Sequence, residues 1–379
     1  MRKAFISPSK YVQGENELFN LGFYIKSLGE SALVIGNSDD INRVQDKLDQ
    51  TSKQFGVTLH LSDFGGEATR EEVDRLKKLA KEKGTDVIVG LGGGKAIDTS
   101  KTVANGYNLI VCPTIAATDA PTSHSAVLYT KDHHFDDYAY FIQNPSVVLM
   151  DTTVIAQAPT RFLISGMGDA LATYYEARAT RRSNSNVNAG LPNGFYSGDT
   201  EPAKGTIASI TLARVCYETI LESGYNAKIA CDKNVVTPAL ENIIEANTLL
   251  SGLGFESGGL AAAHAIYNGL TVLNGPHNFF HGEQVAFTTF VQLILEDAPT
   301  KEVEELLDFS LSVGLPVSLA DLDVEEVNYE EILKVAQKAC IPEESIHAMP
   351  FKVTPESVAQ AIIAADALGR DYKKRKTIK

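Results

Sequence analysis

The first 150 residues alternate short apolar runs with helix-patterned segments, and this alternation limits the possible folds more than any other feature. Short runs rich in β-branched and aliphatic residues, bounded by Gly or Asn, are typical of buried strands. Between them, Thr69-Arg-Glu-Glu72 has the form of a capping box, and Gly84 ends the helix that follows it. Strands and helices in this order predict a mainly parallel, doubly wound sheet. We expect its strands at residues 32–35, 57–61, 86–89, 109–111 and 147–150.

The pattern changes after the last of these strands. The rest of the chain is rich in alanine and helix-patterned, with almost no β-rich runs. We therefore predict an α/β domain over residues 1–160 and an all-helical domain over residues 161–379. We expect a ligand in the cleft between the two domains. Residues 125–129 and 138–142 predict a hairpin, and residues 181–204 predict a long polar surface loop inside the helical domain.

Composition excludes several classes of function. Of the 379 residues, 44% are hydrophobic, which is enough to build sizeable cores. The formal net charge of -14 argues against a general affinity for nucleic acid or anionic membranes. The basic run at residues 373–376 follows a helical pattern, where cations suit the helix C-terminus. No membrane span or signal peptide is expected. The four cysteines form no CxxC pair, which predicts buried free thiols in a cytoplasmic protein.

Two histidines lie in apolar segments that predict helices. His264 follows three alanines, and His281 opens a second apolar run. A buried imidazole can be a core residue bonded to a backbone carbonyl, but two of them also suit a divalent metal. Asp169 would add the carboxylate of a catalytic zinc site, although at its predicted helix start it would also serve as a cap. His277 is a spare candidate. The histidines without a comparable apolar setting are His60, His124, His133, His134 and His347.

A glycine-rich turn, Gly90-Leu-Gly-Gly-Gly94, lies between a predicted strand and a predicted helix. Glycines let the backbone approach a phosphate, and the free N–H groups of a helix N-terminus bind its oxygens. Lys95 stands where a dinucleotide fingerprint has its last glycine, and a tight turn without a ligand is the alternative. The order of strand, glycines and helix favours a phosphate-binding role.

The segment Cys112–Ser123 follows the fourth predicted strand. Open α/β sheets place ligands at the carboxyl ends of their strands, so this segment is a second candidate for ligand contact. Its small hydroxyl residues suit a cofactor, and Asp119 could bind a polyol hydroxyl. The alternative is that Thr118, Asp119 and Pro121 only build a turn.

These segments together resemble the glycerol dehydrogenases of the family III iron/zinc-dependent polyol dehydrogenases, over nearly the whole chain. The resemblance implies a dehydroquinate-synthase-like architecture and an enzyme that oxidises glycerol, or a related vicinal diol, to dihydroxyacetone while NAD is reduced. It also implies a homo-oligomer, often an octamer. The motifs that carry it are residues 7–14, Gly92-Gly-Gly-Lys95 with Asp98 and Lys101, and residues 113–121, 168–173, 237–241, 254–264 and 281–283.

The resemblance also implies site residues. Zinc would be bound by Asp169, His264 and His281, and Asp119 and His264 would contact the substrate hydroxyls as the catalytic residues. The implied NAD-binding residues are Asn37, Gly92, Gly93, Gly94, Lys95, Ala96, Thr114, Ile115, Ala116, Ala117, Ser123, Ser125 and Tyr129.

Three departures from the family pattern stand out. Iron-dependent members have a metal-binding His at the position of Thr173, which favours zinc here. Relatives have Asp at the position of Asn37, so repulsion of a 2′-phosphate is weaker. The loop at residues 181–204 is longer than in most relatives.

The alternative activity on the same architecture is a dehydroquinate-synthase-like cyclase, which needs Lys and Arg in its cleft. Residues 264–283 contain neither.

Overall fold

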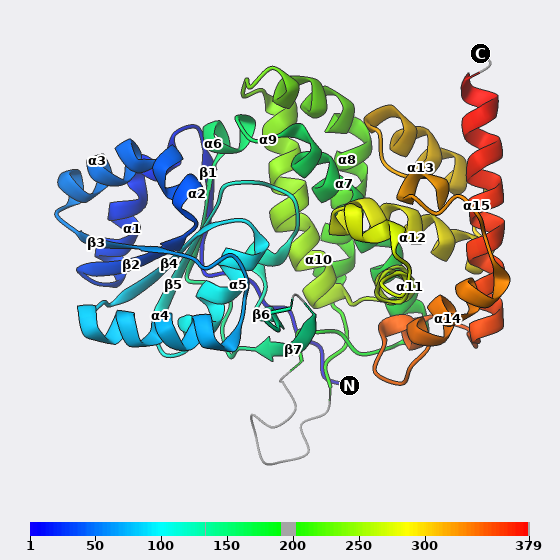
Figure 1. Ribbon diagram of the computed structural model, residues 1–379, viewed down its shortest axis with the longest axis horizontal. Coiled ribbons are helices and arrows are strands. Elements are labelled where there is room, and N and C mark those ends of the chain that lie inside the picture. The colour runs from blue at the N-terminus through cyan, green and yellow to red at the C-terminus, as the bar shows by residue number, and fades with distance from the viewer. Residues whose placement is uncertain (133, 191–201, 378–379) are drawn as a thin grey trace.

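The structure, a computed structural model, describes residues 1–132, 134–190 and 202–377. An α/β region and a helical region lie side by side (Figure 1). The strands of the α/β region are β1 (Tyr11–Gly14), β2 (Ser31–Gly36), β3 (Thr58–Asp63), β4 (Val87–Gly92), β5 (Asn108–Pro113) and β8 (Val147–Asp151). They form a six-stranded sheet in the order β1-β8-β5-β4-β2-β3, and every pair in it is parallel.

The predicted doubly wound sheet is thus confirmed, and each strand expected from the sequence is present. The sequence analysis missed β1, which is short and half-buried and has no apolar run. It pairs with β8 at one edge of the sheet. The order reverses between β2 and β4, because the chain leaves β2 for β3 on one side and returns to β4 on the other.

Alternate residues of the strands point to opposite faces, and helices cover both faces. Leu33 and Ile35 pack with Leu76 of one helical layer, whereas Val34 packs with Leu48 of the other. The helices of this region are α1 (Leu21–Leu28), α2 (Ser38–Arg43), α3 (Gln45–Phe55), α4 (Arg70–Lys83) and α5 (Gly94–Val103), with a 3-10 turn at Glu17–Asn20.

The predicted capping box of α4 is present only in part, whereas the predicted end of the helix is observed. The Thr69 side chain accepts a hydrogen bond from the backbone N–H of Glu72 at 3.2 Å. The Glu72 carboxylate does not complete the box, because it accepts from the Gly65 N–H and from Arg75 instead. Gly84 ends α4 in the left-handed conformation with φ 61°.

The predicted hairpin is present as an antiparallel pair, β6 (Ser125–Tyr129) and β7 (Phe135–Tyr140). It lies outside the main sheet, beneath α5 in Figure 1. Residue 133 at its tip, one of the histidines considered above, lies outside the described residues.

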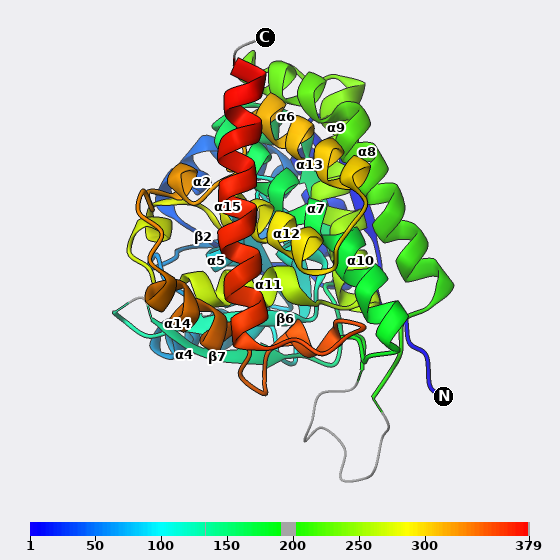
Figure 2. The ribbon, with the colours of Figure 1, turned by 90° about the vertical axis from the view of Figure 1, so that its right-hand side faces the viewer.

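The helical region contains α6 (Thr152–Ala156), α7 (Thr160–Ser183), α8 (Ile207–Asp232), α9 (Pro238–Glu245), α10 (Ser251–Gly258), α11 (Ala262–Leu270), α12 (His281–Leu295), α13 (Thr300–Val313), α14 (Tyr329–Ala339) and α15 (Pro355–Thr377). A π-helical turn, Ala246–Leu250, precedes α10. Short 3-10 turns occur at Ala120–Thr122, Gly275–Asn278, Ala320–Leu322 and Ser345–Ala348. α15 runs along the outside of this region (Figure 2). We keep residue 160, where α7 begins, as the proposed domain boundary.

Two expectations need correction. Asp169 does not start a helix, because α7 begins at Thr160 and Asp169 lies in its interior. Residues 181–183 of the predicted polar loop are the last of α7, and residues 191–201 of that loop lie outside the described residues. The basic run at residues 373–376 lies in α15, in its last turn as expected.

The four cysteines are free. Three of them are buried as predicted, but Cys340 is only half-buried. Among the described residues, no helix combines the length and the apolar character that crossing a bilayer requires.

Candidate metal and nucleotide site

Three helices bring Asp169, His264 and His281 together. Nε2 of His264 lies 3.3 Å from Oδ1 of Asp169, and Nε2 of His281 lies 3.1 Å from the same oxygen. Within the described ranges, these three side chains form a group whose candidate ligand atoms all lie within 4.8 Å of one another. The residues that the sequence analysis selected as metal ligands are therefore neighbours, although they are up to 112 positions apart in the chain.

Glycines allow this approach. α7 and α12 cross so closely that a Cβ atom on Gly282 would lie 1.8 Å from the backbone oxygen of Ser165. A Cβ atom on Gly168 would lie 2.2 Å from the backbone oxygen of Gly282. Because no side chain fits at either position, the first turn of α12 rests directly on α7. This contact puts His281, the first residue of α12, beside Asp169.

Glu176 fixes the ring of His264. It lies on α7 two turns beyond Asp169 and is fully buried. Its Oε2 accepts a hydrogen bond from Nδ1 of His264 at 2.6 Å, and its Oε1 accepts from the backbone N–H groups of Ala261 and His264. Since an ionised carboxylate can only accept, the proton of the imidazole is on Nδ1, and Nε2 is free to face Asp169. Carboxylates beyond the ligands orient metal-binding histidines in this way.

The charges of the group suit a divalent cation. Burial alone would raise the pKa of Asp169, but His281 and His264 hold it well below its ordinary value. Burial likewise opposes the charged form of His264, yet the carboxylates of Glu176 and Asp169 raise its pKa well above the ordinary value. Two carboxylates thus attract positive charge to this position. A divalent ion would supply that charge in place of the imidazole protons, because histidine ligands bind metals in their neutral form.

Other histidines do not join this group. The spare candidate His277 is exposed in a 3-10 turn. His124, which the sequence analysis set aside for want of an apolar sequence setting, is buried, with only 4% of it exposed. Its backbone N–H donates to Oε1 of Glu256 at 2.7 Å, and its Nδ1 contacts the same oxygen. Glu256 also accepts from Asn144 at 2.6 Å, so a carboxylate of α10 binds two segments of the α/β region.

The glycine-rich turn lies at the carboxyl end of β4. Gly92 has φ 144°, a backbone conformation that favours glycine, and a Cβ atom there would lie 3.3 Å from Oδ2 of Asp40. The turn opens directly into α5 at Gly94, so the first N–H groups of that helix face the same edge of the sheet. Asn37, which follows β2 and caps α2, lies across the point where the strand order reverses. Parallel sheets bind nucleotides at such a point.

Lys95 and Asn37 both have protein partners. The ammonium of Lys95 donates to Oε2 of Glu67 at 2.7 Å and lies 5.6 Å from the centre of the Tyr129 ring. The Asn37 side chain caps α2 by accepting from the N–H of Asp40, and it donates to the Asp40 carboxylate at 2.6 Å. The structure therefore places these predicted cofactor residues at the expected edge, with their side chains already engaged by neighbours.

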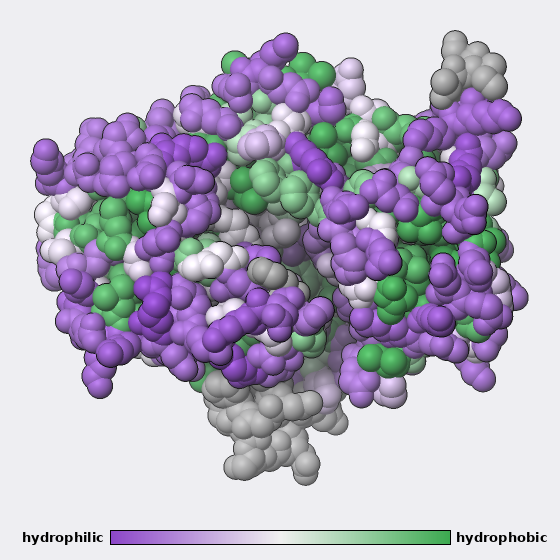
Figure 3. Space-filling view, in the orientation of Figure 1, coloured by the Kyte–Doolittle hydropathy of each residue, from purple (hydrophilic) through white to green (hydrophobic). Residues whose placement is uncertain are grey.

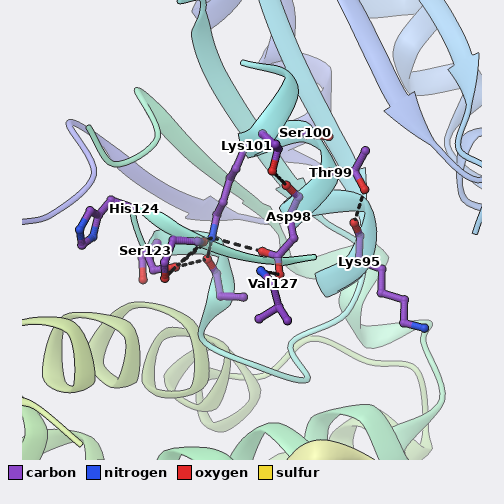
Figure 4. Close-up of polar contacts among 12 residues, drawn as sticks. Lys95, Asp98, Thr99, Ser100, Lys101, Ser123, His124 and Val127 are labelled. Atoms are coloured by element: carbon purple, nitrogen blue, oxygen red, sulfur yellow. Dashed lines mark hydrogen bonds and ion pairs between the residues drawn. The ribbon is translucent and has the colours of Figure 1, made fainter. Parts of the chain in front are cut away.

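A buried lysine organises the loop after β5. Lys101 of α5 donates to the backbone oxygens of Ala120 and Ser125 and to Oγ of Ser123 (Figure 4). Its charge is paired with Asp98, whose other oxygen accepts from the Val127 N–H at 3.0 Å. Sequence reasoning placed Asp98 and Lys101 in a motif but gave them no role. The helix that follows the glycine-rich turn thus also holds the segment with the predicted residues Ser123 and Ser125.

Asp119 lies in this loop and reaches the helical region. Its Oδ2 accepts a hydrogen bond from Oγ of Ser251 at 2.7 Å. Burial, with the negative charge of Asp169 adding to it, raises the pKa of Asp119 to about 8. The loop packs against α7, because a Cβ atom on Gly166 would lie 2.1 Å from the backbone oxygen of Ala116. The predicted substrate-binding carboxylate is therefore close enough to the predicted ligand Asp169 to respond to its charge.

Arg161 pairs with Glu283, which lies 122 positions away in the chain and two residues after His281. Its guanidinium binds both oxygens of Glu283 at 2.6 and 2.7 Å, and Glu283 also accepts from the N–H of Phe280 at the start of α12. The absence of Lys and Arg between residues 264 and 283 therefore does not exclude a cation nearby. The charge of Arg161 is balanced by Glu283.

Comparison with known proteins gives the family. A model of the iron-containing alcohol dehydrogenases matches residues 8–152. Glycerol dehydrogenase of Pseudomonas putida is 46% identical over 374 residues, which are 98% of this chain and 99% of the relative. The chain therefore belongs to the iron-containing alcohol dehydrogenase family. Glycerol dehydrogenase of Escherichia coli O6:H1 is 44% identical over the same shares of both chains.

A solved member of the family has the same fold. Glycerol dehydrogenase of Schizosaccharomyces pombe superposes with a TM-score of 0.92 at 40% identity, over 100% of this chain and 93% of that one. This member of the iron-containing alcohol dehydrogenase family is therefore an oxidoreductase, and the cyclase alternative is not favoured. The individual roles of the metal-binding, cofactor-binding and substrate-binding residues stay predictions.

Proposed function

We propose that this chain is a zinc- and NAD-dependent dehydrogenase that oxidises glycerol, or a related vicinal diol, to dihydroxyacetone or the corresponding ketone. The observation that carries the proposal is the convergence of Asp169, His264 and His281, with Asp119 nearby, from elements far apart in the chain. Relatives named glycerol dehydrogenase at 44 and 46% identity support the substrate class. Figure 3 shows the surface hollowed between the two regions, where a small polyol would enter.

Asp169, His264 and His281 would hold the metal ion. A carboxylate and two imidazoles suit zinc and leave one position for a substrate oxygen, and the same set also suits ferrous iron. Thr173, where iron-dependent members have a histidine, supports zinc because it offers no nitrogen ligand. When bound, the ion supplies Lewis-acid polarisation of the substrate hydroxyl.

NAD would lie along the edge formed by Asn37, Gly92 and the loop after β5. The hollow at this edge is lined by the carboxylates of Asp39, Asp40 and Asp63. Negative charge at this position disfavours a 2′-phosphate, so we propose NAD rather than NADP although residue 37 is not an aspartate. When bound, the nicotinamide ring supplies a hydride acceptor.

Asp119 would orient the substrate by accepting a hydrogen bond from a hydroxyl. A neutral polyol needs such acceptors, whereas a phosphorylated substrate would need unpaired cations. Among the described residues, Arg161 stands near α12, but it is bound by Glu283. The charges therefore favour an uncharged diol.

The test is a panel of glycerol, 1,2-propanediol and 2,3-butanediol with NAD and NADP in parallel, followed by NADH absorbance. Protein stripped by a chelator should lose activity, and restoring it with zinc or with ferrous iron separates the two metals. A matched variant is His264→Ala, with His277→Ala as the control outside the group. Full activity of His264→Ala would overturn the site. The octamer and the cytoplasmic location stay predictions, and the first can be checked by native mass measurement.

A further inference from the structure

Two buried hydroxyl groups connect Asp119 to the helix that bears Asp169. Oγ of Ser251 donates to Oδ2 of Asp119 at 2.7 Å, and Oγ1 of Thr173 lies 2.9 Å from Oγ of Ser251. Ser251 is fully buried and 1% of Thr173 is exposed. Thr173 lies on α7 one turn beyond Asp169, whereas Ser251 opens α10 and Asp119 belongs to the loop after β5. Three separate elements therefore meet in this chain of hydrogen bonds.

The direction of the bonds follows from the acceptor at its end. When Asp119 is ionised, its carboxylate can only accept, so Ser251 donates its single proton to it. Ser251 has lone pairs left and no second proton, and Thr173 therefore donates to Ser251. Each hydroxyl thus donates its hydrogen bond in the direction of Asp119. Donors aligned in this way strengthen one another and hold the carboxylate in one orientation.

Close packing leaves little room for a different arrangement. A Cβ atom on Gly254 would lie 2.4 Å from the methyl carbon of Thr173, so α10 rests directly on that side chain. A Cβ atom on Gly252 would lie 1.8 Å from Oγ1 of Thr122, so the other side of α10 rests on the loop of Asp119. The first turn of α10 is thus enclosed between α7 and the loop. Thr173 contacts its neighbours with both the methyl group and the hydroxyl.

We propose that Ser251 and Thr173 are positioning residues that hold the carboxylate of Asp119 toward the substrate, and that they fix its place relative to the ligand helix α7. The inference rests on the proposed role of Asp119 in substrate binding. It gives Thr173 a function of its own. In iron-dependent members this position bears a metal-binding histidine, whereas here it supports the carboxylate of Asp119, which is proposed to bind the substrate.

The inference predicts a particular kinetic pattern. Among the residues that the structure describes, Ser251 is the side-chain donor to Asp119, and Ser251→Ala removes it. The KM for glycerol should therefore rise about tenfold, as expected for losing one hydrogen bond to an ionised carboxylate. The KM for NAD and the zinc content should not change. Thr173→Val keeps the shape and removes the hydroxyl, and it should raise the KM for glycerol less. Thr173→Ser restores the hydroxyl and should recover the wild-type KM.

Ser257 offers a matched control. It is a buried serine of the same helix, and its hydroxyl accepts from the N–H of Ile6 at 3.1 Å, away from Asp119. Ser257→Ala should lower the unfolding midpoint as Ser251→Ala does, yet leave the KM for glycerol unchanged. If both variants change the KM alike, Ser251 has only a structural role and the inference is wrong.

A double-mutant cycle tests whether Ser251 acts through Asp119. In an Asp119→Asn background, Ser251→Ala should have little further effect on the KM for glycerol, and additive effects would contradict the inference. A crystal structure of Ser251→Ala should show the Asp119 carboxylate rotated, and an unmoved carboxylate would also overturn it. This readout needs no substrate. An inactive wild-type protein with the rotation seen would therefore refute the proposed function and not the positioning of Asp119.

Discussion

Glu176→Gln tests how much the proposed metal site depends on a residue outside its three proposed ligands. The buried carboxylate has three hydrogen-bond donors facing it: the backbone N–H groups of Ala261 and His264, at 2.9 and 3.0 Å, and Nδ1 of His264 at 2.6 Å. Glutamine has a single oxygen. If that oxygen stays with the two N–H groups, the amide NH2 faces Nδ1, and the imidazole proton has to move to Nε2. Protonated Nε2 cannot bind a metal.

The expected magnitude follows from this change. Loss of a carboxylate that supports a metal-binding histidine typically lowers metal affinity by about 10- to 100-fold, or roughly 1.4 to 2.7 kcal/mol. The opposite orientation of the amide leaves the two backbone N–H groups without an acceptor, which costs about 1–3 kcal/mol of stability. Either orientation therefore weakens zinc binding or the protein that binds it.

The assay is a titration of metal-free protein with zinc against a competing chromophoric chelator, together with urea unfolding in the absence of metal. Glu296→Gln is the control, because the side chain of Glu296 is only 4% exposed and also binds α7, but through Arg178 instead of a histidine. It should lower stability and leave the zinc affinity unchanged. A Glu176→Gln protein that binds zinc within about twofold of wild type would refute the reasoning on His264.

Four further predictions follow from the described contacts. Lys101→Met leaves the buried Asp98 without its cation, so the free energy of unfolding measured in urea should fall by about 3 kcal/mol. An unchanged midpoint would contradict the pairing. Asn37→Asp should increase the preference for NAD over NADP in steady-state kinetics, and should lower the melting temperature because it faces the Asp40 carboxylate. Chelator treatment should abolish activity and lower the melting temperature, and added zinc should restore both. The hydrogen bond from Arg75 lowers the pKa of Glu72, so that pair stabilises the fold above the ordinary glutamate pKa and is lost as the pH falls through the lowered value. Urea midpoints of Glu72→Gln should therefore fall less on acidification than those of wild type.

The central strands β2, β4, β5 and β8 could be predicted because they are buried on both faces and stand out as apolar runs. β1 could not, since Tyr11–Gly14 has two polar or flexible positions among four and lies at an edge. The start of α7 was misplaced for a related reason. Gly166 and Gly168 lie in the interior of α7, where they allow contact with neighbouring backbone, and only the packed structure reveals that contact.

The metal-binding candidates could be selected because a histidine among alanines is conspicuous, and the family motifs marked the same residues. Their supporting side chains could not. Glu176, Ser251 and Glu256 lie in ordinary helical sequence, and their partners are 78 or more positions away. The available signal was a charged or hydroxyl side chain at a position that the helical pattern buries. Such a signal indicates that a partner is needed, but it does not say which one.

The hydrogen bonds of Glu256 with His124 and Asn144 limit how the α/β region and the helical region can move relative to each other. Both partners belong to the α/β region and the carboxyl group to the helical region, so buried hydrogen bonds join the two regions here. Separating the regions at this point would leave buried polar groups without partners, which is costly. If the two regions rotate relative to each other when a dinucleotide binds or leaves, the hinge should therefore lie near Glu256. The displacement should be largest at the part of the cleft farthest from it.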